Sequence, residues 1–230
     1  MHINAITHST PETGTKRAEE KDVFKFYWTE PAAIEAYLSY TSTFKYRNAV
    51  DLGCNDGRWL ELMRRYGITI DRAVGIDIRP IEKHYLDVFH QADVLTFPED
   101  EKFDLVVSNP PFSTLLNRFL LKAFNLVNRE DGLVSFFMPI TALATETRKK
   151  IFDAYPPTRV LVYSTRPHCD RMANGKPGSY PGREMAQFEW CFIHNRLKGA
   201  AELEIDPIEW ITYDRDGRLE SIEYETLEVP

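Results

Sequence analysis

The sequence predicts an α/β fold in which a mostly parallel, seven-stranded sheet is flanked by helices. Short apolar runs of strand length alternate along the chain with segments whose apolar residues recur at helical spacing. Such alternation is typical of a parallel sheet covered by helices on both faces. One run, residues 103–107, is a continuous β-branched and aromatic stretch of the kind found in buried strands. The 230 residues are enough for one such domain with a full core.

The elements are expected in a regular order. Strands are predicted at residues 49–52, 72–77, 88–91, 103–107, 132–138, 159–163 and 186–193. Helices are predicted at residues 31–40, 58–66, 115–127 and 141–152. The first helix carries start signals, with Thr29 as its N-cap, Glu30 next and Pro31 near the first turn.

Three regions are expected along the chain. Residues 1–21 are polar and without periodicity, which indicates a flexible arm. Residues 22–195 form the main domain, and residues 196–230 form an acidic tail. Two alternating runs in the tail flank the tetrapeptide at 214–217, Asp-Arg-Asp-Gly, and predict a β-hairpin extension.

The charge is unevenly distributed. The net charge is −7, yet residues 148–183 carry eight Lys and Arg against two acids, and residues from 200 onward carry ten acids against two Arg. A long loop, about 164–185, holds four of the basic residues: Arg166, Arg171, Lys176 and Arg183. Local charge sets the field that a phosphate backbone meets, so this loop is a candidate nucleic-acid contact, although a solvated surface explains it equally well.

Composition also bounds the class of protein. Three cysteines are an odd number and too few for a disulfide framework, which indicates a reducing, cytoplasmic setting. The chain has no apolar run long enough for a membrane span, and its first residues lack the pattern of a signal peptide.

The first chemical signal is a glycine turn at residues 51–57, Asp-Leu-Gly-Cys-Asn-Asp-Gly, between a strand and a helix. Glycines there allow a tight turn and let a ligand approach the main chain at the carboxyl end of a sheet. Asp77 ends the next strand, where a carboxylate can accept both hydroxyls of a ribose. Asp93 follows the third strand, where it can accept from an adenine amino group. The Gly-x-Gly-x-x-Gly pattern of dinucleotide dehydrogenases is absent, since Gly53 and Gly57 are four residues apart.

The decisive signal is the pentapeptide at 108–112, Ser-Asn-Pro-Pro-Phe, after the fourth strand. The two prolines stop the strand and stiffen the turn, which presents Asn109 in one geometry. The side-chain oxygen of Asn109 and the carbonyl of Pro110 can both accept from one amino group. Phe112 supplies a flat apolar face for a planar base, beside Pro111.

These motifs resemble the class I S-adenosylmethionine-dependent methyltransferases, which have a Rossmann-like fold. Within that class the chain is similar to the amino-methyltransferases with an (Asp/Asn/Ser)-Pro-Pro-(Tyr/Phe/Trp) motif, including the N6-adenine DNA enzymes. The segment at 27–31, Tyr-Trp-Thr-Glu-Pro, resembles the element that closes over the cofactor in those enzymes. The resemblance covers residues 22–195.

The resemblance implies S-adenosylmethionine as cofactor and a set of site residues. Asp51 and Gly53 would lie against the methionine moiety, Asp77 would bind the ribose, and Asp93 the adenine. The full implied cofactor set is Tyr27, Thr29, Asp51, Gly53, Asn55, Asp77, Ile78, Asp93, Val94 and Asn109. The implied catalytic set is Asn109, Pro110, Pro111 and Phe112. Candidate substrate contacts are Phe112, the four basic loop residues and Trp190, although strand alternation also explains Trp190 as a core residue.

The acceptor stays open among several classes. A DNA adenine is the first choice, an RNA base (adenine N6 or guanine N2) the second, and a protein glutamine the third. A cofactor-binding subunit without catalytic activity is the remaining alternative. The chain offers little room for a separate target-recognition domain, and the acidic tail with Trp210 could contact a protein partner. No metal site is expected, because the Cys and His residues near 168–194 lack ligand spacing.

Overall fold

The structure is a computed structural model that describes residues 27–41, 45–82, 84–167, 169–172, 184–204 and 206–211. The expected arm at 1–21 and the expected hairpin turn at 214–217 lie outside the described residues. So do Lys176 and Arg183 of the basic loop.

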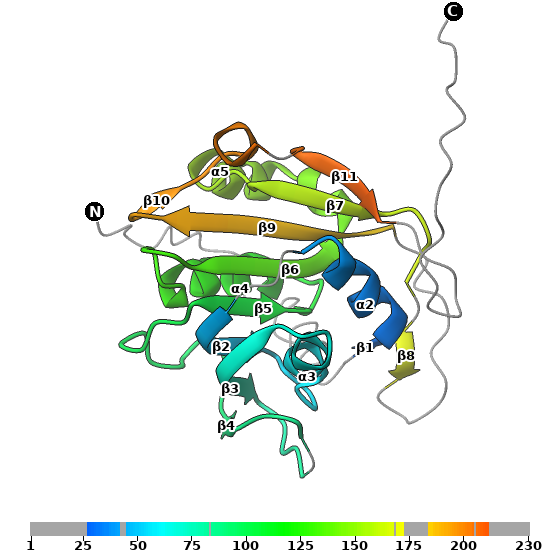
Figure 1. Cartoon of the computed structure of the whole chain (residues 1–230), viewed down its shortest axis with the longest axis vertical. Coiled ribbons are helices and arrows are strands. Elements are labelled where there is room, and N and C mark those ends of the chain that lie inside the picture. The colour runs from blue at the N-terminus through cyan, green and yellow to red at the C-terminus, as the bar shows by residue number, and fades with distance from the viewer. Residues whose placement is uncertain are drawn as a thin grey trace, which may run out of the picture.

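One nine-stranded sheet forms the centre of the molecule (Figure 1). Its order is β11-β7-β9-β6-β5-β2-β3-β4, with β10 paired to β9. All neighbours are parallel except β9, which runs antiparallel to β6, β7 and β10. The strands are β2 (Lys45–Leu52), β3 (Thr69–Asp77), β4 (Val88–Gln91), β5 (Leu105–Ser108), β6 (Leu133–Pro139), β7 (Arg159–Tyr163), β9 (Met185–Ile193), β10 (Arg196–Leu197) and β11 (Ile208–Ile211). The seven predicted strands are all present, and β10 and β11 extend the sheet.

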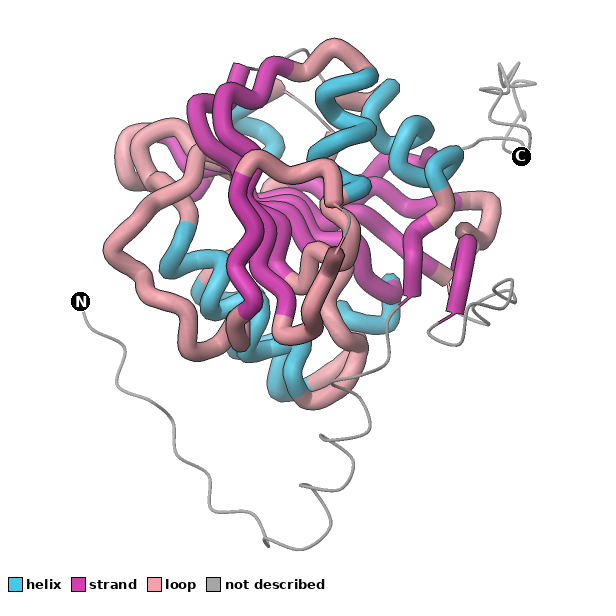
Figure 2. Tube along the Cα trace, turned by 90° about the horizontal axis from the view of Figure 1, so that it is seen from below, coloured by secondary structure: helices cyan, strands magenta, loops and turns pink. Residues whose placement is uncertain are grey.

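Helices cover both faces of this sheet, as expected for the predicted α/β fold. The described helices are α2 (Pro31–Ser39), α3 (Arg58–Arg65), α4 (Leu115–Leu126) and α5 (Glu146–Ala154), with short 3-10 turns at Ile140–Leu143 and Ala200–Leu203. Helices α2 and α3 lie on one face and α4 and α5 on the other (Figure 1). Seen from below, the twisted strands run through the middle of the molecule between the helices (Figure 2).

The strand order reverses direction between the parallel neighbours β2 and β5. From β2 the chain moves outward to β3 and β4, and it then returns to place β5 on the other side of β2. In open α/β sheets this reversal opens a crevice at the carboxyl ends of the two strands, where ligands bind. The glycine turn follows β2 and the Asn-Pro-Pro-Phe segment follows β5, so both lie at that position.

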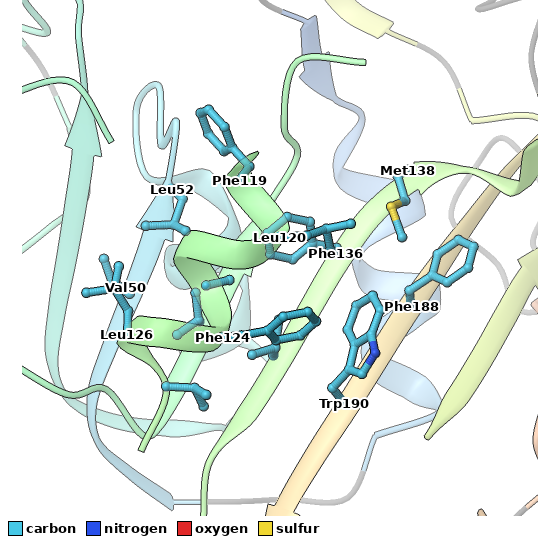
Figure 3. Packing of buried hydrophobic residues seen from close by; sticks show 14 of the residues in the cluster. Val50, Leu52, Phe119, Leu120, Phe124, Leu126, Phe136, Met138, Phe188 and Trp190 are labelled. Atoms are coloured by element: carbon cyan, nitrogen blue, oxygen red, sulfur yellow. The ribbon is translucent and has the colours of Figure 1, made fainter. Parts of the chain in front are cut away.

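The hydrophobic core under α4 contains Trp190, which was a candidate substrate contact. Trp190 is fully buried, with 0% of its surface exposed, and its indole N–H donates to the carbonyl of Tyr155 at 2.9 Å. Its ring lies among Phe124, Phe136 and Phe188 (Figure 3). Trp190 therefore stabilises the sheet–helix interface, and the hypothesis that it stacks on a substrate base is wrong.

A second, two-stranded sheet joins the N-terminal segment to the basic loop. Strand β1 (Tyr27–Thr29) pairs antiparallel with β8 (Cys169–Met172). The loop at 164–185 thus contains a strand that the sequence did not predict. Glu30, not Thr29, occupies the N-cap position of α2, and no side chain in the described part of the chain caps that helix, while Pro31 starts it as expected. Thr29 ends β1 instead, so its expected capping role is wrong.

A buried polar network lies between α2 and the sheet. The Tyr37 hydroxyl donates to Glu189 Oε1 at 2.6 Å and lies 2.8 Å from Ser135 Oγ. Arg159 donates from Nε to Glu189 Oε2 at 2.9 Å, and Gln187 donates to Ser135 Oγ at 2.8 Å. Both oxygens of Glu189 therefore have partners inside the protein. This network fixes α2, and with it the end of β1, against β6, β7 and β9.

Candidate active site

Four strand ends are joined side by side at the carboxyl edge of the sheet. The Ser108 hydroxyl donates to the carbonyl of Leu52 at 2.6 Å, which ties the end of β5 to the end of β2. The amide of Gly53 donates to the carbonyl of Ile76 at 2.8 Å, which ties β2 to β3. The amide of Ala92 donates to the carbonyl of Asp77 at 2.9 Å, which ties β3 to the segment after β4. The motifs predicted from the sequence therefore form one continuous row.

The glycine turn has the backbone that its composition predicted. Gly53 and Gly57 have φ of +74° and +79°, in the left-handed region that glycine adopts without strain. At Gly57 a Cβ atom would also lie 2.5 Å from the Leu86 side chain. The turn passes directly into α3, which begins at Arg58. The space beside Gly57 is therefore filled by Leu86, whereas at Gly53 the nearest atom to a Cβ position would be Phe119 Cε1 at 3.7 Å.

Two buried polar atoms in and beside this turn have no hydrogen-bond partner among the residues that the structure describes. They are Oδ2 of Asp51, whose residue is 1% exposed, and Nδ2 of Asn55. Burial raises the pKa of Asp51 well above its usual value, and the nearby carboxylates of Asp77 and Asp56 raise it further. Leaving such groups without partners costs free energy, so a ligand with a cationic group and an acceptor would stabilise the turn.

The carboxylate of Asp77 is fully engaged by the protein. Its residue is 3% exposed. Its oxygens accept from Nε and Nη2 of Arg79 at 2.9 and 2.8 Å, from the Arg79 amide at 2.9 Å and from the Asn55 amide at 3.0 Å. A ribose diol could take the expected place at Asp77 only if the Arg79 guanidinium moved away. Arg79 was not among the predicted site residues, because the Asp-x-Arg spacing alone does not predict this contact.

The remaining expected cofactor contacts lie further along the same edge. Ile78 follows Asp77 and is 44% exposed, so its side chain is available to an apolar ring. Asp93 is exposed, and its Oδ1 accepts from the Leu95 amide at 2.9 Å, which is ordinary turn chemistry. Val94 is buried at 4% exposure. The structure brings Asp77 and Asp93 to neighbouring strand ends, as their positions predicted.

The Asn-Pro-Pro-Phe segment lies beside the glycine turn. Asn109, Pro111 and Phe112 are half-buried, and Pro110 is buried. Phe112 packs against both hydrophobic cores, one on each face of the sheet. Its side chain is therefore held from both faces of the sheet, just after the carboxyl end of β5.

Strand β1 contacts this segment directly. Nδ2 of Asn109 donates to Oγ1 of Thr29 at 2.9 Å, and Thr29 is 5% exposed. Arg58, at the start of α3, lies with its guanidinium 4.9 Å from the Trp28 ring centroid and makes a long hydrogen bond of 3.5 Å to the Thr29 carbonyl. The segment at 27–31 thus contacts both Arg58, the residue that follows the glycine turn, and Asn109. Tyr27 lies in β1, and its side chain is outside the described part of the structure.

The basic loop begins and ends at this same edge. It leaves β7 after Tyr163 and returns to β9 at Met185, because β9 runs antiparallel to its neighbours. Arg166 pairs with Glu184, which joins the two ends of the loop. Arg171 lies in β8, but its side chain is outside the described part, as are Lys176 and Arg183.

Comparison with known proteins identifies the fold. A family model described as a methyltransferase domain matches residues 25–141, just over half of the chain. The protein belongs to this methyltransferase family. It has the class I S-adenosylmethionine-dependent methyltransferase fold, and S-adenosylmethionine is its cofactor. No curated protein matches the chain.

Solved structures of low identity share the fold. A candidate class I S-adenosylmethionine-dependent methyltransferase from Listeria monocytogenes is 12% identical, with a TM-score of 0.55 over 82% of this chain and 65% of its own. A candidate RNA methyltransferase from Pyrococcus horikoshii is 17% identical, with a TM-score of 0.50 over 70% of this chain and 84% of its own. The N-methyltransferase NodS from Bradyrhizobium japonicum, in complex with S-adenosylhomocysteine, is 14% identical with a TM-score of 0.45 over 79% and 89%. At these identities the likeness concerns the fold.

The residues at the crevice suit this cofactor. The carboxylate of Asp51, with an unpartnered buried oxygen, suits an ammonium group, and Asn55 Nδ2 suits an acceptor. Among the described residues, no three His, Cys, Asp or Glu side chains are grouped to hold a metal ion. No helix in the described part of the chain is both long and apolar enough to span a bilayer.

Proposed function

We propose that this methyltransferase modifies an exocyclic amino nitrogen, and that N6 of adenine in DNA is its acceptor. The observation that carries the proposal is the position of Asn109, Pro110, Pro111 and Phe112. They follow β5 at the point where the strand order reverses, one strand from the glycine turn and tied to it by the bond between Ser108 and Leu52. A target bound there lies next to the cofactor's expected position at Asp51 and Gly53.

The chain's own residues would align the amine. The lone pair of an exocyclic amine is delocalised into its ring, and hydrogen bonds from its N–H groups to Asn109 Oδ1 and the Pro110 carbonyl would hold it for attack. S-Adenosylmethionine supplies an electrophilic methyl group on a sulfonium. The amine would form a bond to that carbon as the carbon–sulfur bond breaks, the neutral thioether S-adenosylhomocysteine would leave, and the methylated nitrogen would pass one proton to water. Alignment and stabilisation of the charge on nitrogen would supply the rate enhancement.

A planar base suits the walls of the crevice. Phe112 is packed from both faces of the sheet, so its ring offers a fixed surface for stacking. A base in a duplex would first have to leave the stack. The loop that carries Arg166, Arg171, Lys176 and Arg183 leaves and rejoins the sheet at this edge, where it can meet phosphates.

The domain layout is part of the proposal. Residues 22–195 would be the catalytic domain, and residues 196–230 an appended acidic segment. The described part of that segment adds β11 to the edge of the sheet and exposes Ile208 and Trp210, at 52% and 59%. This edge could contact a protein partner.

The test is methyl transfer from radiolabelled S-adenosylmethionine to unmethylated duplex DNA, total RNA and protein extract in parallel. Label recovered from DNA as N6-methyladenine would support the full proposal. Label in RNA as N6-methyladenine or N2-methylguanine would keep the mechanism and change the acceptor, as the name of the Pyrococcus neighbour suggests. Label only on glutamine side chains would assign a protein substrate. No transfer to any acceptor would favour a cofactor-binding subunit.

A charge-reversal variant tests the nucleic-acid contact. Replacing Arg166, Arg171 and Lys176 by Glu should weaken DNA binding and reduce its dependence on salt. A matched variant with three other exposed lysines replaced by Glu, Lys149 and Lys150 on α5 and Lys45 at the amino end of β2, has the same net charge and serves as the control. Equal effects of the two variants would mean that the loop has no particular role.

A further inference from the structure

The side-chain contact between Thr29 and Asn109 joins two segments 80 residues apart in the chain. The donor is Nδ2 of Asn109 and the acceptor is Oγ1 of Thr29, at 2.9 Å. The resemblance assigned Thr29 to cofactor binding only, so this contact gives it a different place in the site.

An asparagine amide has two chemically different ends. Nδ2 can only donate hydrogen bonds, and Oδ1 can only accept them. An amine that must give up its N–H hydrogen bonds needs the Oδ1 end. With Nδ2 donating to Thr29, Oδ1 is the end of the amide that can accept from an amine, whereas the reversed amide would present a donor to the amine.

Thr29 is well placed to fix this orientation, because the residues around it are themselves fixed. Its backbone belongs to β1, which pairs with β8, and Arg58 contacts its carbonyl. The following helix, α2, buries five residues, and the Tyr163 hydroxyl donates to the Ala33 carbonyl at 3.1 Å. A catalytic group is held most precisely when its partner sits on rigid elements of this kind.

We infer that Thr29 is a positioning residue for methyl transfer, and that its hydroxyl orients the Asn109 amide so that the oxygen faces the target amine. This inference rests on the proposed function, because only an amine acceptor needs that oxygen. With this role for Thr29, the segment at 27–31 contributes to the part of the site that binds the target amine.

The kinetic test uses Thr29→Val, which keeps the shape of the side chain and removes the hydroxyl. We expect kcat to fall about tenfold, the value of one hydrogen bond, with the dissociation constant for S-adenosylmethionine unchanged within about twofold. Thr29→Ser should restore most of the loss. Thr41→Val is the matched control, because it removes a threonine hydroxyl that donates to the Leu38 carbonyl at the other end of α2. An unchanged kcat, or an affinity loss that accounts for the whole effect, would overturn the inference.

A double-mutant cycle tests the orientation itself. Asn109→Asp replaces the amide by a carboxylate with two equivalent oxygens. A carboxylate presents an acceptor in either orientation, so it needs no neighbour to orient it. Adding Thr29→Val should therefore cost little in the Asn109→Asp background, although it costs about tenfold in the wild-type background. Equal costs in both backgrounds would mean that Thr29 acts in some other way.

A spectroscopic measurement needs no methyl acceptor. The side-chain amide signals of Asn109 in a ¹H–¹⁵N spectrum are identified by their loss in Asn109→Asp. They should move upfield in Thr29→Val, return in Thr29→Ser and stay in place in Thr41→Val. Unmoved signals in Thr29→Val would refute the contact. If the contact holds but the wild-type product carries its methyl group on carbon or oxygen, the proposed function fails instead.

Discussion

Two buried carboxylates in this molecule have opposite surroundings. Glu189 lies within β9, 6% exposed, and both of its oxygens accept hydrogen bonds, from Tyr37 and Arg159. Asp51 lies near the carboxyl end of β2 and is 1% exposed; its pKa is raised, and one of its oxygens has no hydrogen-bond partner in the described part of the chain. A buried carboxylate surrounded by protein donors holds elements together, whereas one without them is costly until a ligand supplies the partner.

The difference follows from position in the sheet. Glu189 sits between two strands and beneath α2, where neighbouring elements supply donors. Asp51 sits at the strand-order reversal, where the chain turns away on both sides. The same residue chemistry therefore contributes to stability in one region and to ligand binding in the other, and substitutions in the two regions should separate these effects.

The largest expected effect is a loss of stability when the hydrogen-bond network around Glu189 is broken. Arg159→Met leaves Glu189 as a buried charge without its cationic partner, and it should lower the free energy of unfolding by about 3–5 kcal/mol in urea denaturation. Affinity for S-adenosylmethionine should not change. Arg196→Met is the control, because its ion pair with Glu202 is exposed and worth less than about 1 kcal/mol. If Arg159→Met costs no more than this control, Glu189 does not depend on its partner.

The next largest effect is expected at Asp77, which ends β3, the strand beside that of Asp51. Asp77→Ala should weaken binding of S-adenosylmethionine by about 1.5–3 kcal/mol in calorimetry, because it removes the acceptor for charge-assisted hydrogen bonds. Asp87→Ala is the comparison variant, since Asp87 is bound by Arg64 and precedes β4, at the opposite edge of the sheet. Equal dissociation constants for wild type and Asp77→Ala would remove Asp77 from the site.

The free energy of unfolding should depend on pH differently in the wild type and in Asp51→Asn. Because the pKa of Asp51 is raised on folding, the folded state holds its proton more tightly than the unfolded state. Stability is therefore lost as pH rises above the ordinary value near 4, by up to about 1.4 kcal/mol per pH unit, until the raised pKa is passed. The Asn variant should lack this loss and be more stable at pH 7 without cofactor.

Cofactor affinity should respond in the opposite direction. A cationic ammonium favours ionised Asp51, so wild-type affinity for S-adenosylmethionine should increase with pH, and Asp51→Asn should show a weaker and flatter profile. Calorimetry at pH 5.5, 7 and 8.5 measures both. Parallel profiles for the two proteins would contradict the role of Asp51.

The smallest effect is expected from Arg79→Ala. Arg79 binds Asp77 where the ribose is expected, so its removal should lower the melting temperature of the free protein and tighten S-adenosylmethionine binding a few-fold, about 1 kcal/mol. Arg72→Ala, which removes an ion pair with Glu101, is the control. Weaker binding in Arg79→Ala would mean that the arginine contacts the cofactor.

Much of the fold could be predicted because its signals are local. The bounds of β4 and β7 match the prediction, and glycines and prolines mark the turns after β2 and β5 at fixed places in the chain. Those turns also carry the candidate site residues. Their adjacency could be predicted from the order of the parallel strands. The C-terminal part was harder, because β10 and β11 are short strands whose apolar pattern is brief.

The sequence could not predict contacts between distant segments. Thr29 fits the statistics of an N-cap, but its partner Asn109 is 80 residues away. The pairing of β8 with β1 is equally non-local. The pattern around Trp190 predicts a strand but not that α4 covers that face, and no periodicity predicts the rotamer that places Arg79 on Asp77.

The most direct test of the account is Asn109→Ala, assayed for methyl transfer and cofactor binding on the same preparation. We expect transfer to fall about 10²–10³-fold while the dissociation constant for S-adenosylmethionine stays within about twofold, because the proposed function assigns the Asn109 side chain to the target amine rather than to the cofactor. Transfer at a near wild-type rate would contradict the amino-methyltransferase mechanism.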